Sequence, residues 1–289
     1  MSSSTSARPM PALFIGHGSP MNTLEENGFT NSWKRIGAAI GKPRGILVVS
    51  AHWFIGATAV TAMPRPRTIH DFYGFPRALS EFEYPAPGMP ELAAEVVDLA
   101  RPDWVGLDHD QWGLDHGTWS VLAHLFPDAD VPVVQLSINS SKPMAYHLEL
   151  GARLDALRSR GVLVLSSGNV VHNLRRIDWR AGDTGEPWVR RFDDAATELM
   201  AHRPADVATL ADHPDFAAAA PTPDHFAPLL YTAGIAAAAQ TGAEALVRGF
   251  SLGSVSMTCF GVSCGALGCR LGHDAAMLPV DVPPDQTNT

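Results

Sequence analysis

Four short, uninterrupted apolar segments constrain the fold of this chain more than any other feature of its sequence. They are residues 11–15 (PALFI), 44–50 (RGILVVS), 131–138 (VPVVQLSI) and 161–166 (GVLVLS). Apolar residues follow one another in these segments instead of alternating with polar ones, which is typical of strands covered on both faces, as in parallel sheets. We therefore predict four neighbouring, buried and mostly parallel strands. Residues 57–63, 244–250 and 254–262 are candidates for further strands, with antiparallel pairing left open.

Five longer segments have the features of helices and lie between or after these strands. They span residues 90–101, 117–126, 143–160, 187–202 and 226–240. The first opens with Pro90 and Glu91, which suit a first helical turn, and the third ends before Gly161, a residue type that commonly follows a helix. Strands that alternate with helices predict an α/β fold, in which helices flank a mostly parallel central sheet.

The chain has no repeat, and no linker long enough to separate two domains. A chain of 289 residues can bury a sizeable core without disulfides or help from a second subunit. We expect a single domain over residues 11–270, between a disordered tail at residues 1–10 and a loosely attached C-terminal tail at residues 271–289. No obligate second subunit is expected.

Charge and cysteine content limit the partners and the compartment. The net charge is −9, and an acidic surface repels phosphate backbones, so we expect no nucleic acid as partner. No apolar run is long enough to span a bilayer, and the first ten residues lack the apolar segment of a secretory signal. Cys259, Cys264 and Cys269 form an odd set that indicates a reducing compartment and packing roles. We therefore expect a cytoplasmic protein without membrane contact.

Four of the twelve histidines occupy comparable places in this pattern. His17 follows the first apolar segment, His52 the second and His172 the fourth, while His225 directly precedes an apolar helix. Ligands of open α/β sheets bind outside the carboxyl ends of the strands. Each histidine alone could be an ordinary hydrogen-bonded loop residue, but four in equivalent places indicate a shared metal site. Converging imidazoles suit Zn²⁺ or Fe²⁺ better than Mg²⁺ or Ca²⁺, and the spacing leaves the choice between the two metals open.

The other histidines give weaker signals. His116 follows Asp115 at the start of a predicted helix, so its residue type is explained by the helix terminus alone. His70 lies in an aromatic-rich loop that either lines a pocket for an aromatic substrate or anchors itself by packing. The chain contains no GxGxxG, GxxxxGK[ST], HExxH or CxxC motif, so a phosphate-binding loop for a nucleotide is not indicated.

Taken together, seven motifs resemble those of the class III extradiol ring-cleaving dioxygenases, in their stand-alone DOPA 4,5-dioxygenase-like branch. The motifs are GHGSP at 16–20, SAHW at 50–53, IHDFYGFP at 69–76, YPAPG at 84–88, DHGTW at 115–119, SGNVVHN at 167–173 and PTPDHF at 221–226. They occur in order over about residues 11–262, whereas the segment from Cys264 onward matches nothing in the family.

The resemblance implies a role for each of five histidines. His17, His52 and His225 correspond to metal ligands, and His172 corresponds to a catalytic base or, with zinc bound, a fourth ligand. His116 corresponds to a catalytic histidine that steers oxygen or stabilises the ring-bound intermediate. Relatives that cleave protocatechuate have a glutamate in place of His225, and this difference leaves both Fe²⁺ and Zn²⁺ open as the metal.

The reaction implied by the resemblance is the opening of a catechol ring by O₂ to a muconic semialdehyde, with non-haem Fe²⁺ as cofactor. The catechol, DOPA-like in its side chain, would lose one phenolic proton to His172. Two other functions stay open on the sequence: a zinc-dependent hydrolase or zinc-binding protein on the same scaffold, and a small-molecule binding protein without turnover.

Overall fold

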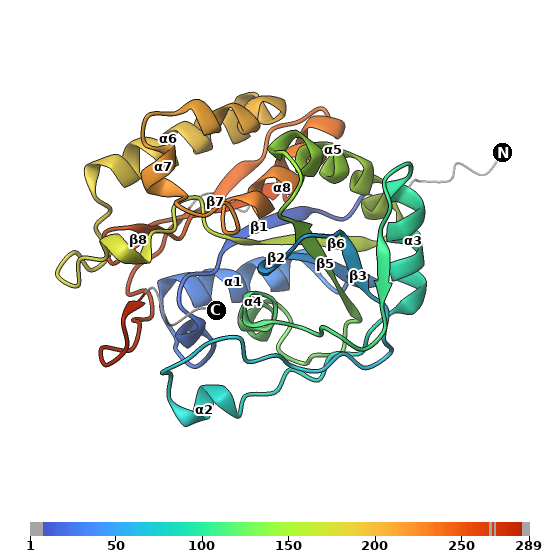
Figure 1. The fold of residues 1–289 in the computed structure, drawn as a ribbon, viewed down its shortest axis with the longest axis horizontal. Coiled ribbons are helices and arrows are strands. Elements are labelled where there is room, and N and C mark those ends of the chain that lie inside the picture. The colour runs from blue at the N-terminus through green and yellow to red at the C-terminus, as the bar shows by residue number, and fades with distance from the viewer. Residues whose placement is uncertain (1–7, 266–267, 269, 285–289) are drawn as a thin grey trace.

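The computed structural model describes residues 8–265, 268 and 270–284 (Figure 1). Its strands are β1 Ala12–Gly16, β2 Gly45–Ile55, β3 Ala59–Thr61, β4 Gly106–Asp108, β5 Val133–Asn139, β6 Val162–Gly168, β7 Glu244–Arg248, β8 Phe250–Ser251, β9 Val255–Ser256, β10 Cys259–Val262 and β11 Arg270–Leu271. Its α-helices are α1 Gly28–Ile40, α2 Arg77–Ser80, α3 Pro90–Ala100, α4 His116–Leu125, α5 Met144–Leu154, α6 Pro187–His202, α7 Phe216–Ala219 and α8 Ala227–Ala238. Four 3₁₀ helices span Pro20–Thr23, Asp155–Arg160, Leu174–Arg176 and Pro204–Asp212.

The predicted α/β fold with a mostly parallel central sheet is confirmed. In the described part of the chain, nine strands form one sheet in the order β11-β7-β10-β1-β6-β2-β5-β3-β4. The four strands predicted from the apolar segments are neighbours in it, and β1–β6, β6–β2 and β2–β5 all pair in parallel. Strand β10 pairs antiparallel with both β1 and β7, and β3 pairs antiparallel with β5.

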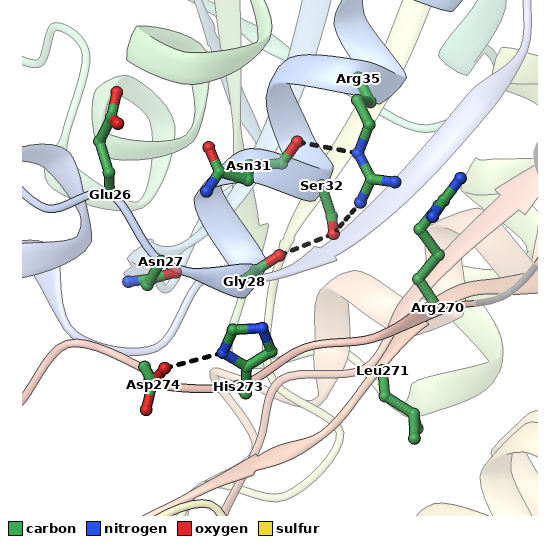
Figure 2. A pocket seen from close by; sticks show the side chains of 10 residues that line it. All are labelled: Glu26, Asn27, Gly28, Asn31, Ser32, Arg35, Arg270, Leu271, His273 and Asp274. Atoms are coloured by element: carbon green, nitrogen blue, oxygen red, sulfur yellow. Dashed lines mark hydrogen bonds and ion pairs between the residues drawn. The ribbon is translucent and has the colours of Figure 1, made fainter.

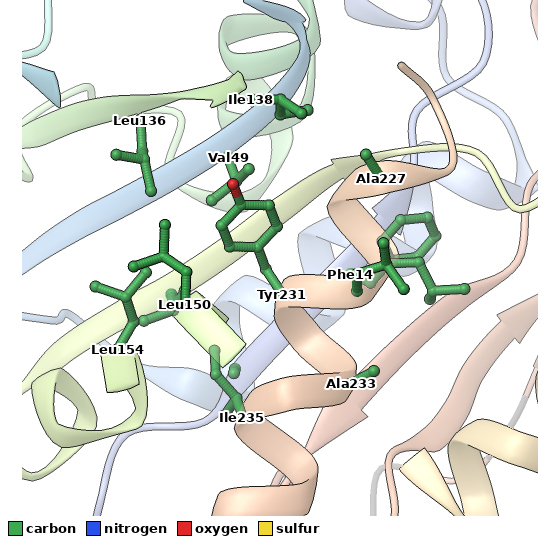
Figure 3. Close-up of a cluster of buried hydrophobic side chains, with 14 of the residues drawn as sticks. Phe14, Val49, Leu136, Ile138, Leu150, Leu154, Ala227, Tyr231, Ala233 and Ile235 are labelled. Carbon is green, nitrogen blue, oxygen red and sulfur yellow. The ribbon is translucent and has the colours of Figure 1, made fainter. Parts of the chain in front are cut away.

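Both faces of the sheet are buried, which explains the uninterrupted apolar segments. Along β1, Ala12 and Phe14 point into the core shared with α5 and α8, whereas Leu13 and Ile15 point into the core shared with α1 and α4. Figure 1 shows these helix pairs on opposite sides of the sheet. Helix α8 is buried from residue 227 to 236, and Figure 3 shows its Tyr231 among apolar side chains from the strands and α5.

Strand β2 is longer than the sequence predicted. Its pairing with β6 ends at Ser50, as expected, but the chain stays extended to Ile55. Its register with β5 shifts between Val49 and Phe54, so an irregular stretch carries His52 inside the strand instead of after it. The polar residues that mark this stretch look like a strand end in the sequence, because an irregularity and a terminus interrupt an apolar run in the same way.

The predicted helices are present, with two differences. The segment predicted as one helix over 143–160 is α5 followed by a 3₁₀ helix, and Gly161 ends it with φ of 77°, in the left-handed conformation. Helix α1 was not predicted, although Asn27 and Thr30 form a reciprocal capping box at its start. Its buried Phe29, Trp33 and Ile36 are spaced i, i+4 and i+7, so the helical periodicity was available in the sequence and was overlooked.

Parts of both predicted tails pack against the domain. Met10 exchanges two hydrogen bonds with Arg158, while residues 1–7 lie outside the described part. At the other end, Gly28 N donates to His273 O, and Ala276 is 2% exposed. Figure 2 shows His273 beside the first turn of α1, with its Nδ1 hydrogen-bonded to Asp274. Both residues line an open cavity of about 640 Å³. Residues 272–278 thus contact the domain through backbone hydrogen bonds and burial that the composition does not reveal.

Two further expectations concern cysteines and membranes. Cys259 is buried in β10 and Cys264 is half-buried, and the two thiols are not joined to each other in a disulfide. Cys269 lies outside the described residues. Among the helices that the structure describes, none combines the length and the apolar character needed to cross a bilayer.

Replacing Gly234 by alanine should destabilise the protein, although alanine usually favours a helix by about 1 kcal/mol over glycine. A Cβ at Gly234 would lie 2.0 Å from Leu148 O of α5, and backbone atoms cannot move aside cheaply. We expect Gly234→Ala to lower the free energy of unfolding by about 1–3 kcal/mol, the usual cost of overpacking. Urea unfolding measures this, with Gly56→Ala as control because a Cβ there meets nothing within 4 Å. An unchanged or higher midpoint for Gly234→Ala would contradict this account of the α5–α8 contact.

Candidate metal centre

The structure brings together all five histidines that the sequence analysis singled out. Nε2 of His17 lies 3.4 Å from Nε2 of His52, and one ligand atom from each of His17, His52 and His116 falls within a 4.8 Å group. The ring centre of His225 lies 5.3 Å from that of His17 and 5.0 Å from that of His52. His172 stacks on His225 with ring centres 3.6 Å apart.

The backbone at the carboxyl end of β6 holds three of these histidines in place. His17 N donates to Gly168 O, and Asn169 N donates to His225 O. A Cβ at Gly168 would lie 2.3 Å from His225 O, so only glycine lets the segment before α8 approach this closely. His172 N donates to Ala219 O, which fixes the loop after β6 against α7.

A hydrogen-bond chain fixes the proton on His17. Ser167 Oγ donates its single hydrogen to Gly117 O at 2.5 Å, so it can only accept from Nδ1 of His17, which lies 3.0 Å away. A neutral imidazole carries one N–H, so Nε2 of His17 has a free lone pair. This lone pair points at Nε2 of His52.

His225 is oriented by the residue before it. Its Nδ1 lies 2.5 Å from Oδ2 of Asp224, and its Nε2 is buried with no hydrogen-bond partner among the described residues. Burial raises the pKa of Asp224, but the neighbouring imidazole of His225 outweighs this, so the carboxyl pKa lies well below its usual range. A carboxylate behind a ligating imidazole is the usual support of a protein metal ligand.

Asp71 is the site residue that the sequence analysis missed. Its Oδ1 lies 3.0 Å from Nδ1 of His116 and accepts a hydrogen bond from His116 N, while its Oδ2 lies 3.3 Å from Nδ1 of His52. Its position next to His70, in the quoted IHDFYGFP motif, was the available signal. Nε2 of His70 forms a hydrogen bond with Phe82 O. The ring of Phe72 packs against those of His116 and Trp119. These contacts favour the anchoring interpretation of the aromatic loop.

Burial keeps the central imidazoles neutral. It lowers the pKa of His17 well below the ordinary value, and the neighbouring His52 lowers it further. The pKa values of His52 and His172 are lowered in the same way, by burial first and then by His116 and His225 respectively. Neutral imidazoles are the form that binds metals.

The residues present fit a metal ion. Two nitrogens bound at 2.0–2.1 Å to one tetrahedral ion stand about 3.4 Å apart, which is the separation of Nε2 in His17 and His52. In the described part of the chain, Nε2 of His116 and Nε2 of His225 are buried without hydrogen-bond partners. Buried nitrogens without partners are costly unless a ligand uses them.

A small cavity opens beside these histidines. It has a volume of about 210 Å³, and its lining includes His172, His225, Arg175 and Thr222. Sites for drug-sized molecules span roughly 300–1,000 Å³, so this cavity suits a smaller molecule, such as one aromatic ring with a short side chain.

The metal-free protein should lose stability in acid. Below pH 6.5, His17, His52 and His172 are protonated in the unfolded chain but stay neutral in the folded chain. Each of them therefore lowers the free energy of unfolding by about 1.4 kcal/mol for each pH unit that the pH falls. Burial and nearby Asp71 raise the pKa of Asp115 to about 6, which opposes this trend with one proton. We expect the Tm, measured in the presence of a chelator, to fall from pH 7 to pH 5. A flat or rising Tm would show that these imidazoles titrate normally.

Comparison with known proteins gives one family. Residues 10–260 match the family model described as the catalytic LigB subunit of aromatic ring-opening dioxygenase. The 4,5-DOPA dioxygenase extradiol of Escherichia coli K12 is 49% identical over 259 residues, covering 87% of this chain and 94% of that protein. The 4,5-DOPA dioxygenase extradiol of Beta vulgaris is 35% identical, covering 78% and 86% respectively.

A solved structure agrees with these relatives. The crystal structure of an uncharacterized protein from Escherichia coli K12 superposes with a TM-score of 0.77 at 43% sequence identity, covering 88% of this chain and all of that one. The match to the family model spans strands β1 to β9 and the segments that carry the five histidines. The chain therefore belongs to the LigB family of class III extradiol, aromatic ring-opening dioxygenases.

Proposed function

We propose that the protein opens the aromatic ring of a catechol with O₂, at a non-haem metal ion held by His17, His52 and His225. The convergence of these three imidazoles, with Nε2 of His17 and His52 3.4 Å apart, is the observation that carries the proposal. Bound Fe²⁺ would supply the electron transfer between catechol and O₂. The product would be a muconic semialdehyde.

Two further histidines would handle protons and charge. His172 lines the cavity and is neutral because burial lowers its pKa, so it can accept a phenolic proton from the catechol. When zinc is bound, His172 would act as a fourth ligand, and its ring lies against that of His225. His116 groups with His17 and His52, and its buried Nε2, when it carries the hydrogen, would donate to developing negative charge there.

Two metal ions, Fe²⁺ and Zn²⁺, are candidates for this site. Fe²⁺ is the choice for ring cleavage, but an all-histidine donor set also suits Zn²⁺, and it lacks the carboxylate of the two-histidine-one-carboxylate iron triad. A zinc-dependent hydrolase or zinc-binding protein is therefore the second candidate function. We also propose a cytoplasmic location without an obligate second subunit, because the odd set of three cysteines indicates a reducing compartment.

Anaerobic reconstitution tests this function. The metal-free protein is loaded with Fe²⁺ or Zn²⁺ and mixed with DOPA or an unsubstituted catechol in an oxygen electrode. We expect oxygen uptake, and absorbance of a ring-opened product, with iron alone. If the protein binds zinc and neither the iron-loaded nor the zinc-loaded form takes up oxygen, the zinc-dependent hydrolase or zinc-binding protein is favoured. If the metal-free protein binds catechol without turnover, a small-molecule binding protein is favoured.

Alanine variants of His17 and His172 distinguish a metal ligand from a catalytic base. His17→Ala removes a metal–nitrogen bond, so bound iron should fall sharply. His172→Ala should keep most of the iron but lose roughly 10²–10⁴-fold in turnover, the usual contribution of general acid–base catalysis. High pH should partly restore its activity, because the catechol then ionises without help. If His172→Ala empties the site as fully as His17→Ala, His172 is a structural ligand and the zinc protein gains support.

We further propose that the catechol carries a carboxylate, as DOPA does, and that Arg175 binds it. Arg175 lines the cavity with His172 and His225, three residues after His172 along the chain. Asn173 Oδ1 accepts a hydrogen bond from Arg175 N, and its Nδ2 donates to Ala218 O, so the backbone below the guanidinium is fixed. Guanidinium and carboxylate make paired, charge-assisted hydrogen bonds.

Arg175→Gln should raise the KM for DOPA by about tenfold, the lower end of what a hydrogen bond to a charged group contributes. The KM for dopamine, which lacks the carboxylate, should not change. Arg176→Gln is the matched control, because Arg176 lies over the Trp188 ring at 4.6 Å and is not among the residues that line the cavity. Equal KM changes for both substrates would rule out carboxylate recognition by Arg175.

A further inference from the structure

A segment near the C-terminus packs against the candidate site, although it follows the residues that match the family model. The match ends at residue 260, and the segment comprises residues 272–282. Burial alternates along its middle: Ala276 and Leu278 are 2% and 6% exposed, whereas Met277 between them is 43% exposed. This alternation is typical of an extended chain with one face on the protein. The side chains of Ala276 and Leu278 therefore belong to the interior of the domain.

Ala276 and Leu278 line a small internal cavity together with His172. This cavity has a volume of about 10 Å³, the space of about one water molecule, and its lining also includes Leu174. His172 and Leu174 line the larger cavity of about 210 Å³ as well. The two cavities therefore adjoin at this pair of side chains, with Leu278 on the side of the smaller one.

Hydrogen bonds to its backbone fix this segment to the loop that follows His17. Ser19 Oγ donates to Met277 O at 3.0 Å, and Ala276 N donates to Asn22 Oδ1 at 3.2 Å. Asn22 Nδ2 in turn donates to His17 O at 3.0 Å, so one buried side chain joins the segment to the backbone of a proposed metal ligand. The segment is therefore held in a defined position relative to the site.

We propose that the side chains of Ala276 and Leu278 form a wall of the catechol site, and that Leu278 limits the size of a ring substituent next to a hydroxyl. The inference rests on the proposed function, in which His172 takes the proton of one catechol hydroxyl. The ring carbon beside that hydroxyl then lies on the side of His172. An alkyl group on this carbon needs space there, and the adjoining cavity holds only about one water molecule.

Leu278→Ala tests the wall, with 3-isopropylcatechol and unsubstituted catechol as probes. The isopropyl group has as many carbon atoms as the substitution removes, so the variant should make room for it. In the iron-loaded protein, we expect the ratio of kcat/KM for 3-isopropylcatechol to kcat/KM for catechol to rise at least about tenfold. This is the lower end of the range for an alkyl group fitted to an apolar pocket.

Two further variants control for damage to the segment. Met277→Ala is the matched control, because the Met277 side chain is exposed between the two wall residues, and it should leave the ratio unchanged. Leu278→Met roughly keeps the volume of the side chain and should also keep the wild-type ratio. A loosened segment would lower kcat/KM for both catechols alike, so the ratio separates a wall from a merely structural role.

Equilibrium binding separates this inference from the proposed function. The ratio of the Kd values of zinc-loaded protein for the two catechols should shift toward 3-isopropylcatechol in Leu278→Ala, without any turnover. If wild-type protein binds catechol but opens no ring, the proposed function fails and this shift still supports the wall. An unchanged ratio in Leu278→Ala, an equal change in Met277→Ala, or wild-type protein that accepts both catechols equally well would overturn the inference. If neither catechol binds, no catechol site lies beside Leu278 and both proposals fail.

Discussion

Parallel pairing of β1, β6 and β2 is the constraint on which the candidate site depends. Gly16 pairs with Gly168, and Ser50 pairs with Ser167, so the three strands end their pairing at the same level. The residues that follow leave one edge of the sheet together, and His17 and His52 are among them. Antiparallel pairing would have sent one of these histidines to the opposite edge. The parallel direction of these strands is thus what brings the imidazoles together.

Orientation and charge at the site are set by different forces. Burial removes water from the imidazoles, and this keeps His17, His52 and His172 neutral. Hydrogen-bond acceptors on the outer side of the rings then decide which nitrogen carries the hydrogen. Burial without these acceptors would leave the tautomer unspecified, and acceptors without burial would favour protonated rings that cannot bind a metal. The site needs both.

The sequence was sufficient for the central strands, most helices and the convergence of four histidines, because each depends on local features such as apolar runs, capping residues and strand ends. His116 was singled out by the family resemblance alone. It was insufficient for Asp71, which meets His116 across 45 residues of chain, since nothing local marks which carboxylate reaches an imidazole. The irregularity in β2 and the packing of residues 272–278 were missed for a related reason. Register shifts and backbone hydrogen bonds leave no compositional trace.

The fold also links the site to the core through α8. His225 lies two residues before this helix, and Ala227 N donates to Pro223 O, so the segment that carries the imidazole is continuous with the first turn. The helix itself cannot slide, because Gly151 and Gly234 bring its backbone against α5 and Tyr231 is wedged between the layers. A displacement of α8 along the sheet would move His225 relative to His17, which is fixed to β6. The glycines that permit close helix packing therefore also determine the geometry of the candidate metal centre.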